Sequence, residues 1–177
     1  MRICVFCGSS AGRDPAYAEA ARSLGAAIVA GGDSLVYGGG SVGLMGVVAD
    51  AVLFAGGRAV GVIPQALAAP EVAHAGLSDL HVVGTMHERK AMMADLSDAF
   101  LALPGGFGTF EEFLEIVTWA QLRLHRKPCV LVNVTGYYDA LVASFDLAVA
   151  AGFLAAPSRA LVRVAASPAE ALALVRG

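Results

Sequence analysis

The sequence predicts an α/β protein with a doubly wound, Rossmann-like parallel sheet that carries helices on both faces. Short apolar segments alternate with helical patterns along the 177 residues, and this alternation is typical of sheets built from strand–helix–strand units. Segments such as Val60–Ile63 and Cys129–Val132 are apolar on both faces, as expected for parallel strands that helices cover on both sides. The length, without a linker or an internal repeat, suits a single domain over residues 1–177.

The first elements are predicted from strand and helix signals that follow one another closely. The apolar run Arg2–Cys7 predicts a first strand. Pro15–Ala30 is predicted to be helical, because Asp14 is a suitable N-cap and proline fits the first position of a helix. Leu35–Tyr37 is a short predicted strand that runs into a series of glycines.

The rest of the chain continues the alternation, apart from one irregular segment. Further strands are predicted at Arg58–Ile63, His81–Val83, Ala99–Leu103, Pro128–Asn133 and Ala160–Val164. Further helices are predicted at Gly43–Ala55, Met86–Leu96, Phe110–Leu122, Tyr137–Ala150 and Pro168–Val175. The segment Gln65–Leu80 follows neither pattern and is predicted to be a loop or excursion.

The composition argues against membranes and nucleic acids as partners. The longest run without a charged residue is Ser34–Ala49, and five glycines interrupt it, whereas a spanning helix needs about 20 predominantly apolar residues. The N-terminal segment turns polar too soon for a signal peptide. The net charge is −3 and no run of Lys or Arg occurs, so no nucleic-acid partner is expected. We therefore expect a cytoplasmic protein.

The three cysteines are interpreted as buried thiols. Cys4 and Cys7 have C-x-x-C spacing, but both fall in the first predicted strand, where residues three apart face opposite sides. No second Cys/His pair completes a zinc site, and the four histidines show no ligand spacing. No metal and no cofactor is expected, and Cys129 is read in the same way as the other two.

Three glycine-rich turns carry the main functional signal. They are Gly8–Ser10, Gly38–Gly46 and Gly105–Gly108, and each follows a predicted strand. Ligands of open α/β sheets bind beyond the carboxyl ends of the strands. We therefore expect the three turns to meet at one edge of the sheet and to form a ligand site there.

The turn Gly105–Gly108 is the best candidate for a phosphate site. Glycines let the backbone approach a ligand closely, and the helix that follows adds partial positive charge at its N-terminus. The order of glycines is neither G-x-G-x-x-G nor a Walker loop. A tight strand-to-helix turn without a ligand is the alternative interpretation.

Glu112 has two interpretations. Thr109–Glu112 has the pattern of a capping box, in which Glu112 would bond back to the N-cap amide. Phe110 and Phe113 belong to an apolar stripe that must face the core, which places Glu112 beside the glycine turn. A carboxylate next to a phosphate site is electrostatically unfavourable, so a catalytic role is the second interpretation.

A second capping box lies at Thr85 and Glu88. Arg89 and Lys90 follow it and fall in the first turns of the predicted helix. The helix dipole disfavours cations at that end. The position of the two cations therefore favours a functional reason for them over a solvated helix face.

Together these motifs resemble the Lonely Guy (LOG) family. PGGFGTFEE matches the PGGxGTxxE motif of that family, and CGSS, YGGGSVGLMG, MHERKAMM and IVTWAQL are also similar to it, in order, over about residues 2–150. Members are cytokinin riboside 5′-monophosphate phosphoribohydrolases, often labelled lysine decarboxylases. The resemblance implies a nucleotide-binding domain that hydrolyses the N-glycosidic bond of N6-substituted adenosine 5′-monophosphates, and a homodimer with its sites near the subunit interface.

The resemblance also implies roles for particular residues. Arg89 and Glu112 would be the catalytic pair. The nucleoside monophosphate would be bound by Gly8, Ser9, Gly39, Gly40, Met86, Lys90, Gly105, Gly106, Gly108 and Thr109, with Thr118 and Glu71 at two further matching positions. The surroundings of Glu71 are the least distinctive of these.

Two other functions remain open at this point. Molybdenum cofactor carriers are related α/β proteins with glycine-rich turns, and they would make this chain a binding protein that has no need of Arg89 together with Glu112. A decarboxylase that uses pyridoxal phosphate would need a Schiff-base lysine. The chain has two lysines, and only Lys90 would suit that role, because Lys127 directly precedes a strand.

Overall fold

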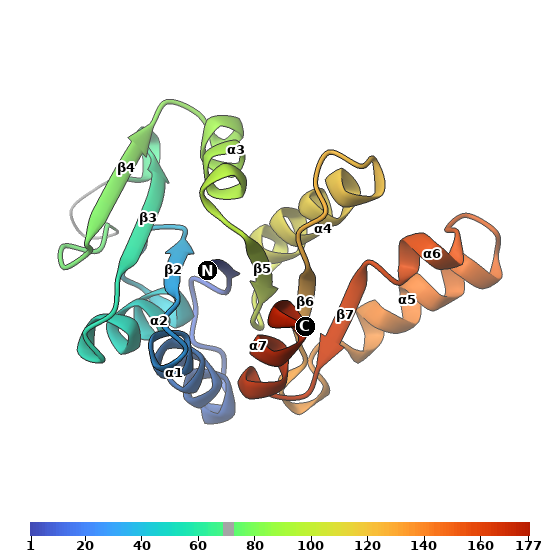
Figure 1. Ribbon diagram of the computed structural model, residues 1–177, viewed down its shortest axis with the longest axis horizontal. Coiled ribbons are helices and arrows are strands. Elements are labelled where there is room, and N and C mark those ends of the chain that lie inside the picture. The colour runs from blue at the N-terminus through green and yellow to red at the C-terminus, as the bar shows by residue number, and fades with distance from the viewer. Residues whose placement is uncertain (69–72) are drawn as a thin grey trace.

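The computed structural model describes residues 1–68 and 73–177, and its strands form one seven-stranded, all-parallel sheet. Their order across the sheet is β4-β3-β2-β1-β5-β6-β7 (Figure 1). The strands are β1 (Arg2–Phe6), β2 (Ser34–Tyr37), β3 (Ala59–Pro64), β4 (Asp79–Val83), β5 (Ala99–Ala102), β6 (Cys129–Val132) and β7 (Val162–Ala165). The helices are α1 (Pro15–Ala30), α2 (Gly43–Phe54), α3 (Met86–Leu96), α4 (Phe107–Gln121), α5 (Asp139–Ala150), α6 (Ala156–Arg159) and α7 (Pro168–Arg176).

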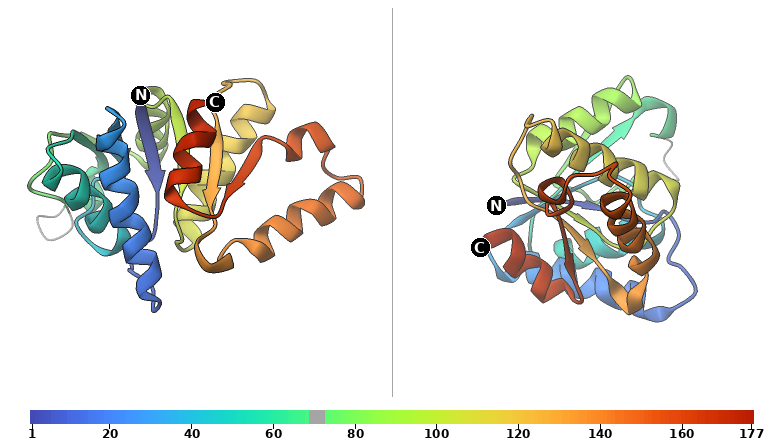
Figure 2. Two further views of the ribbon diagram at one scale, coloured as in Figure 1. Left: turned by 60° about the horizontal axis from the view of Figure 1, so that its bottom comes forward. Right: turned by 90° about the vertical axis from the view of Figure 1, so that its right-hand side faces the viewer.

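Helices cover both faces of the sheet, which confirms the predicted doubly wound architecture. Ile3 and Val5 of β1 belong to an apolar cluster with buried residues of α1, α2 and α7. Cys4 and Phe6 of the same strand belong to a second cluster, with buried residues of α3 and α4. Figure 2 shows the helices on either side of the strands. Each strand of the centre is therefore buried on both faces, as its continuous apolar sequence requires.

The strand order changes direction at β1, and this creates the crevice where ligands bind in such folds. β1 pairs with β2 on one side and with β5 on the other, so the chain leaves β1 towards one half of the sheet and later returns to build the other half. The loops that follow β1 and β5 meet at the carboxyl edge, where the Gly8 amide donates to the Pro104 carbonyl at 3.0 Å. The predicted glycine turns thus flank the topological switch point.

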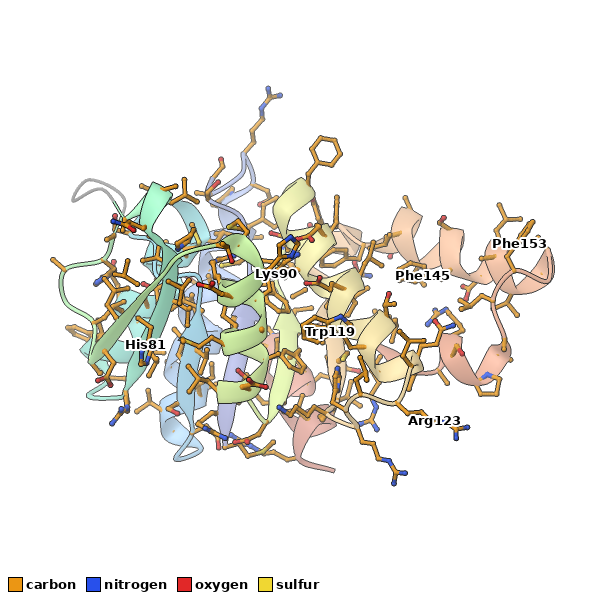
Figure 3. The ribbon with its side chains drawn as sticks, turned by 90° about the horizontal axis from the view of Figure 1, so that it is seen from above. His81, Lys90, Trp119, Arg123, Phe145 and Phe153 are labelled. Carbon is orange, nitrogen blue, oxygen red and sulfur yellow. The ribbon has the colours of Figure 1, made fainter. Side chains whose placement is uncertain are left out.

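The helices α3 and α4 lie side by side on one face of the sheet. Figure 3 shows them from above, with Lys90 between the two ribbons. Met93 of α3 and Phe113 of α4 bury their side chains in the same apolar cluster. The first turns of these helices point their amides towards the carboxyl edge, so the two helices bring the predicted site residues together.

Some predicted boundaries differ from the structure, and one helix was missed. α4 begins at Phe107 rather than at Phe110, because Gly106 has an extended backbone and serves as the N-cap. α6 was not predicted; it begins with a proline in its first turn. Its C-cap is Ala160, so β7 begins at Val162 and not at the predicted Ala160.

The predicted excursion Gln65–Leu80 contains more regular structure than expected. Gln65–Leu67 forms one turn of 3-10 helix. β4 begins at Asp79, because it pairs with Val60 at the start of its register with β3. Among the helices of the described residues, none is long and apolar enough to cross a membrane.

The close approach of α1 and α2 generates a test of the packing. Gly25 is buried in α1, and a methyl group there would lie 2.8 Å from the Val48 carbonyl oxygen. Gly25→Ala should destabilise the fold by about 1–3 kcal/mol, although alanine is the better helix former by about 1 kcal/mol. Urea unfolding measures this difference. Ser23→Ala, on the exposed side of the same helix, is the control, and an equal or raised stability of Gly25→Ala would contradict the packing described.

Candidate active site

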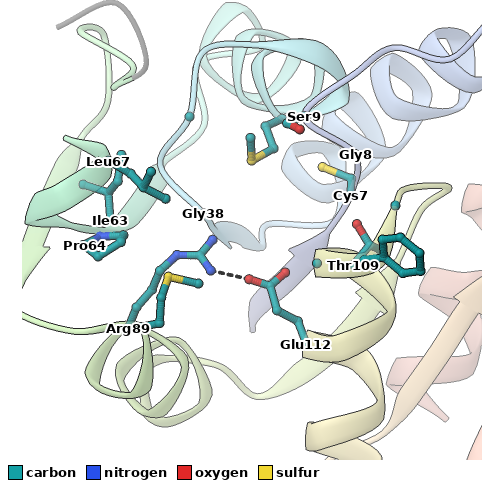
Figure 4. A pocket seen from close by; sticks show the side chains of 16 residues that line it. Cys7, Gly8, Ser9, Gly38, Ile63, Pro64, Leu67, Arg89, Thr109 and Glu112 are labelled. Atoms are coloured by element: carbon teal, nitrogen blue, oxygen red, sulfur yellow. Dashed lines mark hydrogen bonds and ion pairs between the residues drawn. The ribbon is translucent and has the colours of Figure 1, made fainter. Parts of the chain in front are cut away.

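A cavity of about 330 Å³ lies at the carboxyl edge of the sheet (Figure 4). The glycine turns after β1, β2 and β5 form part of its wall, and the first turns of α3 and α4 form the rest together with the end of β3. Its lining residues are Cys7, Gly8, Ser9, Gly38, Gly40, Met45, Ile63, Pro64, Leu67, Met86, Arg89, Gly106, Phe107, Gly108, Thr109 and Glu112. The predicted convergence of three glycine turns on one site is therefore confirmed.

Several glycines are required by the close packing of these turns. The Leu44 amide donates to the Gly8 carbonyl at 3.0 Å, so the second turn is bonded to the first. A methyl group on Gly105 would lie 2.1 Å from Thr109 Oγ1 and 2.8 Å from the Gly8 amide nitrogen. Gly43 has a φ of +59° and packs directly against Ser9. A side chain at these positions would push the turns apart.

Gly106 and Gly108 are different, because nothing in the fold requires glycine there. A methyl group at either position would have no neighbouring atom within 4 Å, and neither has a positive φ. Gly108 lies inside the first turn of α4, where glycine costs about 1 kcal/mol relative to alanine. Both residues line the cavity, so their missing side chains leave the helix N-terminus open to a ligand.

Arg89 and Glu112 form a buried ion pair across the cavity. The Arg89 guanidinium donates through Nη1 to Glu112 Oε1 and through Nε to the Val62 carbonyl at 3.0 Å. Arg89 is 8% exposed and Glu112 is 9% exposed. Figure 4 shows the pair facing each other from α3 and α4. The two helices are thus joined at the site by a charge pair that is largely withdrawn from water.

Gly38 allows the Arg89 side chain to take this position. A methyl group on Gly38 would lie 2.3 Å from Arg89 Nη2. The guanidinium cannot move aside without loss of its bonds to Val62 and Glu112. Gly38 was predicted only as part of the glycine turn after β2, and the structure gives it a specific steric role beneath Arg89.

Burial raises the pKa of Glu112 above its ordinary value, and the Arg89 guanidinium beside it opposes this shift. A buried carboxyl beside a guanidinium can change its protonation state as its surroundings change. Such groups are candidates for acid–base work or for stabilising a developing positive charge. The pair is therefore a candidate catalytic centre.

The predicted capping box at Thr109 and Glu112 is wrong. At Thr85 and Glu88 the predicted N-cap is confirmed, but Glu88 reaches the Gly84 amide instead of the Thr85 amide. α4 starts at Phe107, so Glu112 lies well beyond the position from which it could reach an N-cap amide, and it bonds to Arg89 instead. Thr85 Oγ1 accepts from the Glu88 amide at 3.1 Å, and Glu88 accepts from the Gly84 amide at 2.8 Å.

Lys90 lies outside the cavity lining and holds α3 to α4. Its ammonium group lies 2.5 Å from Glu111 and 3.0 Å from Glu115, and its side chain is 9% exposed. Burial alone would lower the pKa of Lys90, but the hydrogen bonds to Glu111 and Glu115 outweigh it and raise this pKa. A Schiff-base lysine needs a lowered pKa, so the ion pairs of Lys90 argue against that role.

The other predicted residues fall in different places. Gly8, Ser9, Gly40, Met86 and Thr109 line the cavity. Gly105 lines an adjoining cavity of about 310 Å³. Gly39, with a φ of +75°, is not among the lining residues. Thr118 is exposed on α4 and donates to the Leu114 carbonyl at 2.7 Å; it does not reach the cavity of its own chain. Glu71 lies outside the described residues.

Sequence reasoning missed part of the lining. The missed residues are mainly Cys7, Met45, Ile63, Pro64, Leu67 and Phe107. Met45 and Phe107 lie within motifs that were recognised, so their place could have been found. Ile63 and Pro64 end β3, and the rule that ligands bind at carboxyl ends of strands would have pointed to them.

The structure offers no metal site within residues 1–68 and 73–177, since no three His, Cys, Asp or Glu side chains gather there in the manner of ligands. The C-x-x-C cysteines face opposite sides of the sheet, because Cys4 and Cys7 belong to different apolar clusters. Burial raises the pKa of both thiols well above its ordinary value. Neither thiol is suited to act as a nucleophile at neutral pH.

Comparison with known proteins gives three findings. A family model described as "Possible lysine decarboxylase" matches residues 45–175. The chain is 51% identical over 175 residues to the cytokinin riboside 5′-monophosphate phosphoribohydrolase LOG7 of Arabidopsis thaliana, covering 99% of this chain and 79% of the relative. It is 50% identical to the enzyme of the same name from Rhodococcoides fascians, covering 98% of this chain and 88% of that relative.

Among solved structures, a Moco Carrier Protein from Chlamydomonas reinhardtii is similar, with a TM-score of 0.73 and 26% identity over 99% of this chain and 94% of that one. The identity to the phosphoribohydrolases is about twice as high and spans nearly the whole chain. The motifs that carry the resemblance include both members of the buried Arg89–Glu112 pair. The chain therefore belongs to the Lonely Guy family of cytokinin riboside 5′-monophosphate phosphoribohydrolases, to which the lysine decarboxylase description of the family model is also attached.

Proposed function

We propose that the chain is a phosphoribohydrolase that cleaves N6-substituted adenosine 5′-monophosphates to the free base and ribose 5-phosphate. The observation that carries the proposal is the buried Arg89–Glu112 pair in a cavity whose wall is an unobstructed helix N-terminus. The similar proteins of Arabidopsis thaliana and Rhodococcoides fascians are named as cytokinin riboside 5′-monophosphate phosphoribohydrolases. No cofactor or metal is needed for this hydrolysis.

The 5′-phosphate would bind at the start of α4. Gly106 and Gly108 leave the backbone there uncovered, and the amides of the first turn have no partner within the helix. These amides and the helix dipole favour an anion. Thr109 adds a buried hydroxyl that lines the same cavity. Phosphate held here would fix the ribose beside Glu112.

Glu112 would stabilise the reacting ribose. Cleavage of an N-glycosidic bond develops positive charge on the sugar, and a carboxylate can stabilise that charge or activate water. Water adds at C1′, and the base leaves with the electrons of the N-glycosidic bond and takes up a proton. Arg89 would hold the Glu112 carboxylate in place and oppose the effect of burial on its pKa.

The chain would work as a cytoplasmic homodimer. Thr118 is exposed on α4, outside the cavity of its own chain. In a dimer with sites near the subunit interface, it would contribute to the site of the second copy. Lys90 would act on the nucleotide indirectly, by holding Glu111, Glu115 and the start of α4 against α3.

A cofactor carrier is the second candidate, because the solved Moco Carrier Protein has a similar fold at 26% identity. A carrier has no use for a buried carboxylate with a raised pKa beside an anion site. Release of free base from isopentenyladenosine 5′-monophosphate or from AMP, followed by chromatography, decides between the two. Copurification of a pterin with no base release would favour the carrier.

Substitution of the charge pair should abolish turnover in a protein that still folds, at a cost in stability because the remaining charge loses its partner. Glu112→Gln and Arg89→Ala should each lower kcat about a hundredfold or more, since they remove acid–base or electrostatic assistance at the reacting carbon. Glu19→Gln, at an exposed surface ion pair, is the matched control and should keep full activity. Near-wild-type turnover in either site variant, measured below its unfolding temperature, would remove that residue from the mechanism.

The carboxyl of Glu112 should titrate above its ordinary value of 4.5. It ionises as the pH rises through this raised pKa, so the carboxylate form, and with it activity, is lost as the pH falls through the same range. Carbon-13 NMR of the glutamate carboxyls identifies the resonance, because it is absent in Glu112→Gln. Arg89→Ala should raise the pKa of Glu112 further, since the guanidinium opposes the effect of burial. A pKa of Glu112 at or below 4.5 would show that burial does not determine the ionisation of this carboxyl.

Gly108→Ala should affect the stability of the fold and the binding of the phosphate in opposite directions. Alanine should stabilise α4 by about 0.5–1 kcal/mol, because its methyl group meets no protein atom. The same methyl group projects from the turn where the phosphate would bind, so KM should rise while the unfolding temperature also rises. Unchanged KM in a stabilised variant would place the phosphate elsewhere.

A further inference from the structure

A second cavity of about 330 Å³ lies at the opposite edge of the sheet, where β6 and β7 begin. Its lining residues are Ala120, Arg123, His125, Arg126, Lys127, Pro128, Ala160, Leu161 and Arg163. None of them lines the cavity around Glu112. The second cavity is therefore separate from the site of the proposed reaction.

The charge of this cavity is one-sided. Arg123, Arg126, Lys127 and Arg163 are four of the twelve Lys and Arg residues of a chain whose net charge is −3. The described residues that line the cavity include no Asp or Glu. Like charges gathered in one concave place repel one another unless an anion compensates them.

The cationic groups are not neutralised by the protein. Within the described part of the chain, the side chains of Arg123 and Arg126 form no hydrogen bond or ion pair, and both residues are exposed. Lys127 donates to the Ala94 carbonyl at 2.7 Å, and Arg163 donates to the Leu174 carbonyl at 2.6 Å. Both of these acceptors are neutral, so the four positive charges remain available to a ligand.

The loop that carries three of these cations is held in place. His125 Nδ1 accepts from the Lys127 amide at 3.1 Å, so its Nε2 carries the proton and donates to the Ile116 carbonyl at 2.9 Å. The Lys127 side chain fastens the loop to the end of α3. The cavity is thus a preformed site between the end of α4, the loop that follows it and the start of β7.

Arg123 keeps a costly backbone conformation at this place. Its φ is +63°, in the left-handed region that favours glycine, and Figure 3 shows its side chain extending away from the ribbon. The dipole of α4 favours a cation near its C-terminus, but it does not explain Arg163, which comes from β7. The end of α4 accounts for this conformation, because the Arg123 and Leu124 amides donate to the Ala120 and Trp119 carbonyls at 3.0 and 2.9 Å, as in a Schellman motif. The turn fixes the place of Arg123 in the lining of the cavity.

We infer that the cavity lined by Arg123, Arg126, Lys127 and Arg163 is a second anion-binding site, which takes a ligand with a chain of two or more phosphoryl groups. Planar guanidinium groups bind phosphoryl oxygens in pairs, and the volume suits a small ligand. Pyrophosphate itself and the phosphate chain of a nucleoside triphosphate share this chemistry. Binding here is independent of the hydrolysis proposed above.

Isothermal titration calorimetry of the full chain with pyrophosphate tests the site. Arg123→Gly/Arg126→Ala removes the two unpaired guanidinium groups and relieves the backbone strain, so the fold should survive. Its affinity for pyrophosphate should fall by at least about tenfold, the loss expected for one charge-assisted hydrogen bond. Arg22→Ala, on α1 with a surface ion pair, should bind as the wild type does. The double variant should keep its hydrolytic activity.

A parallel titration with ATP distinguishes the two sources of the ligand. Tighter binding of ATP than of pyrophosphate, lost in the double variant, indicates a nucleotide; equal affinities indicate the phosphate chain alone. No binding of pyrophosphate or ATP to the wild type at millimolar concentration would overturn the inference. A second result would also overturn the inference: the double variant binds pyrophosphate as tightly as the wild type, and Gly108→Ala binds it more weakly. The anion would then lie at the start of α4.

Discussion

The buried ion pair between Arg89 and Glu112 is the interaction on which the site depends. It joins two helices, α3 and α4, that enter the cavity from neighbouring parts of one sheet face. Removing one member would leave the other charge buried without a partner, which is strongly unfavourable. The Val62 carbonyl and the absence of a side chain on Gly38 hold the guanidinium in its place. Burial of the pair, and not its mere presence, raises the pKa of Glu112.

The glycines around this pair serve two different purposes. Gly8, Gly43 and Gly105 permit the turns to pack against one another, and a side chain at any of them would meet protein atoms. A side chain at Gly106 or Gly108 would meet no protein atoms. Glycine destabilises a helix relative to alanine, and no contact within the fold requires it at these two positions. The first three glycines therefore allow the turns to form the cavity, whereas Gly106 and Gly108 leave the cavity accessible to an anion.

Much of the fold could be predicted from the sequence, because apolar strands and capped helices are encoded locally. Both ends of α1 and α3 match the prediction from their caps and periodicity. The start of α4 did not, since the Thr109–Glu112 pattern imitates a capping box while Gly106 is the actual N-cap. Local patterns cannot decide between two such starts when the deciding contact, from Glu112 to Arg89, crosses 23 residues.

The same limit applies to the sites. The motifs identified Arg89 and Glu112, but their burial and the steric role of Gly38 required the packed structure. Lys90 and Arg89 are adjacent in sequence, yet one binds Glu111 and Glu115 while the other faces the cavity. Arg123, Arg126 and Lys127 lie within five residues of one another, but Arg163, the fourth cation of the basic cavity, lies 36 residues beyond Lys127. Only the pairing of β6 with β7 brings these cations together.

The central claim is that the start of α4 holds the phosphate and places the ribose against residue 112. A crystal structure of Glu112→Gln with bound AMP tests it most directly, because this variant should bind the nucleotide without cleaving it. The account predicts phosphate oxygens at the amides of Gly106–Thr109 and C1′ facing the side chain of residue 112. Phosphate bound elsewhere, or a ribose turned away from that side chain, would contradict it.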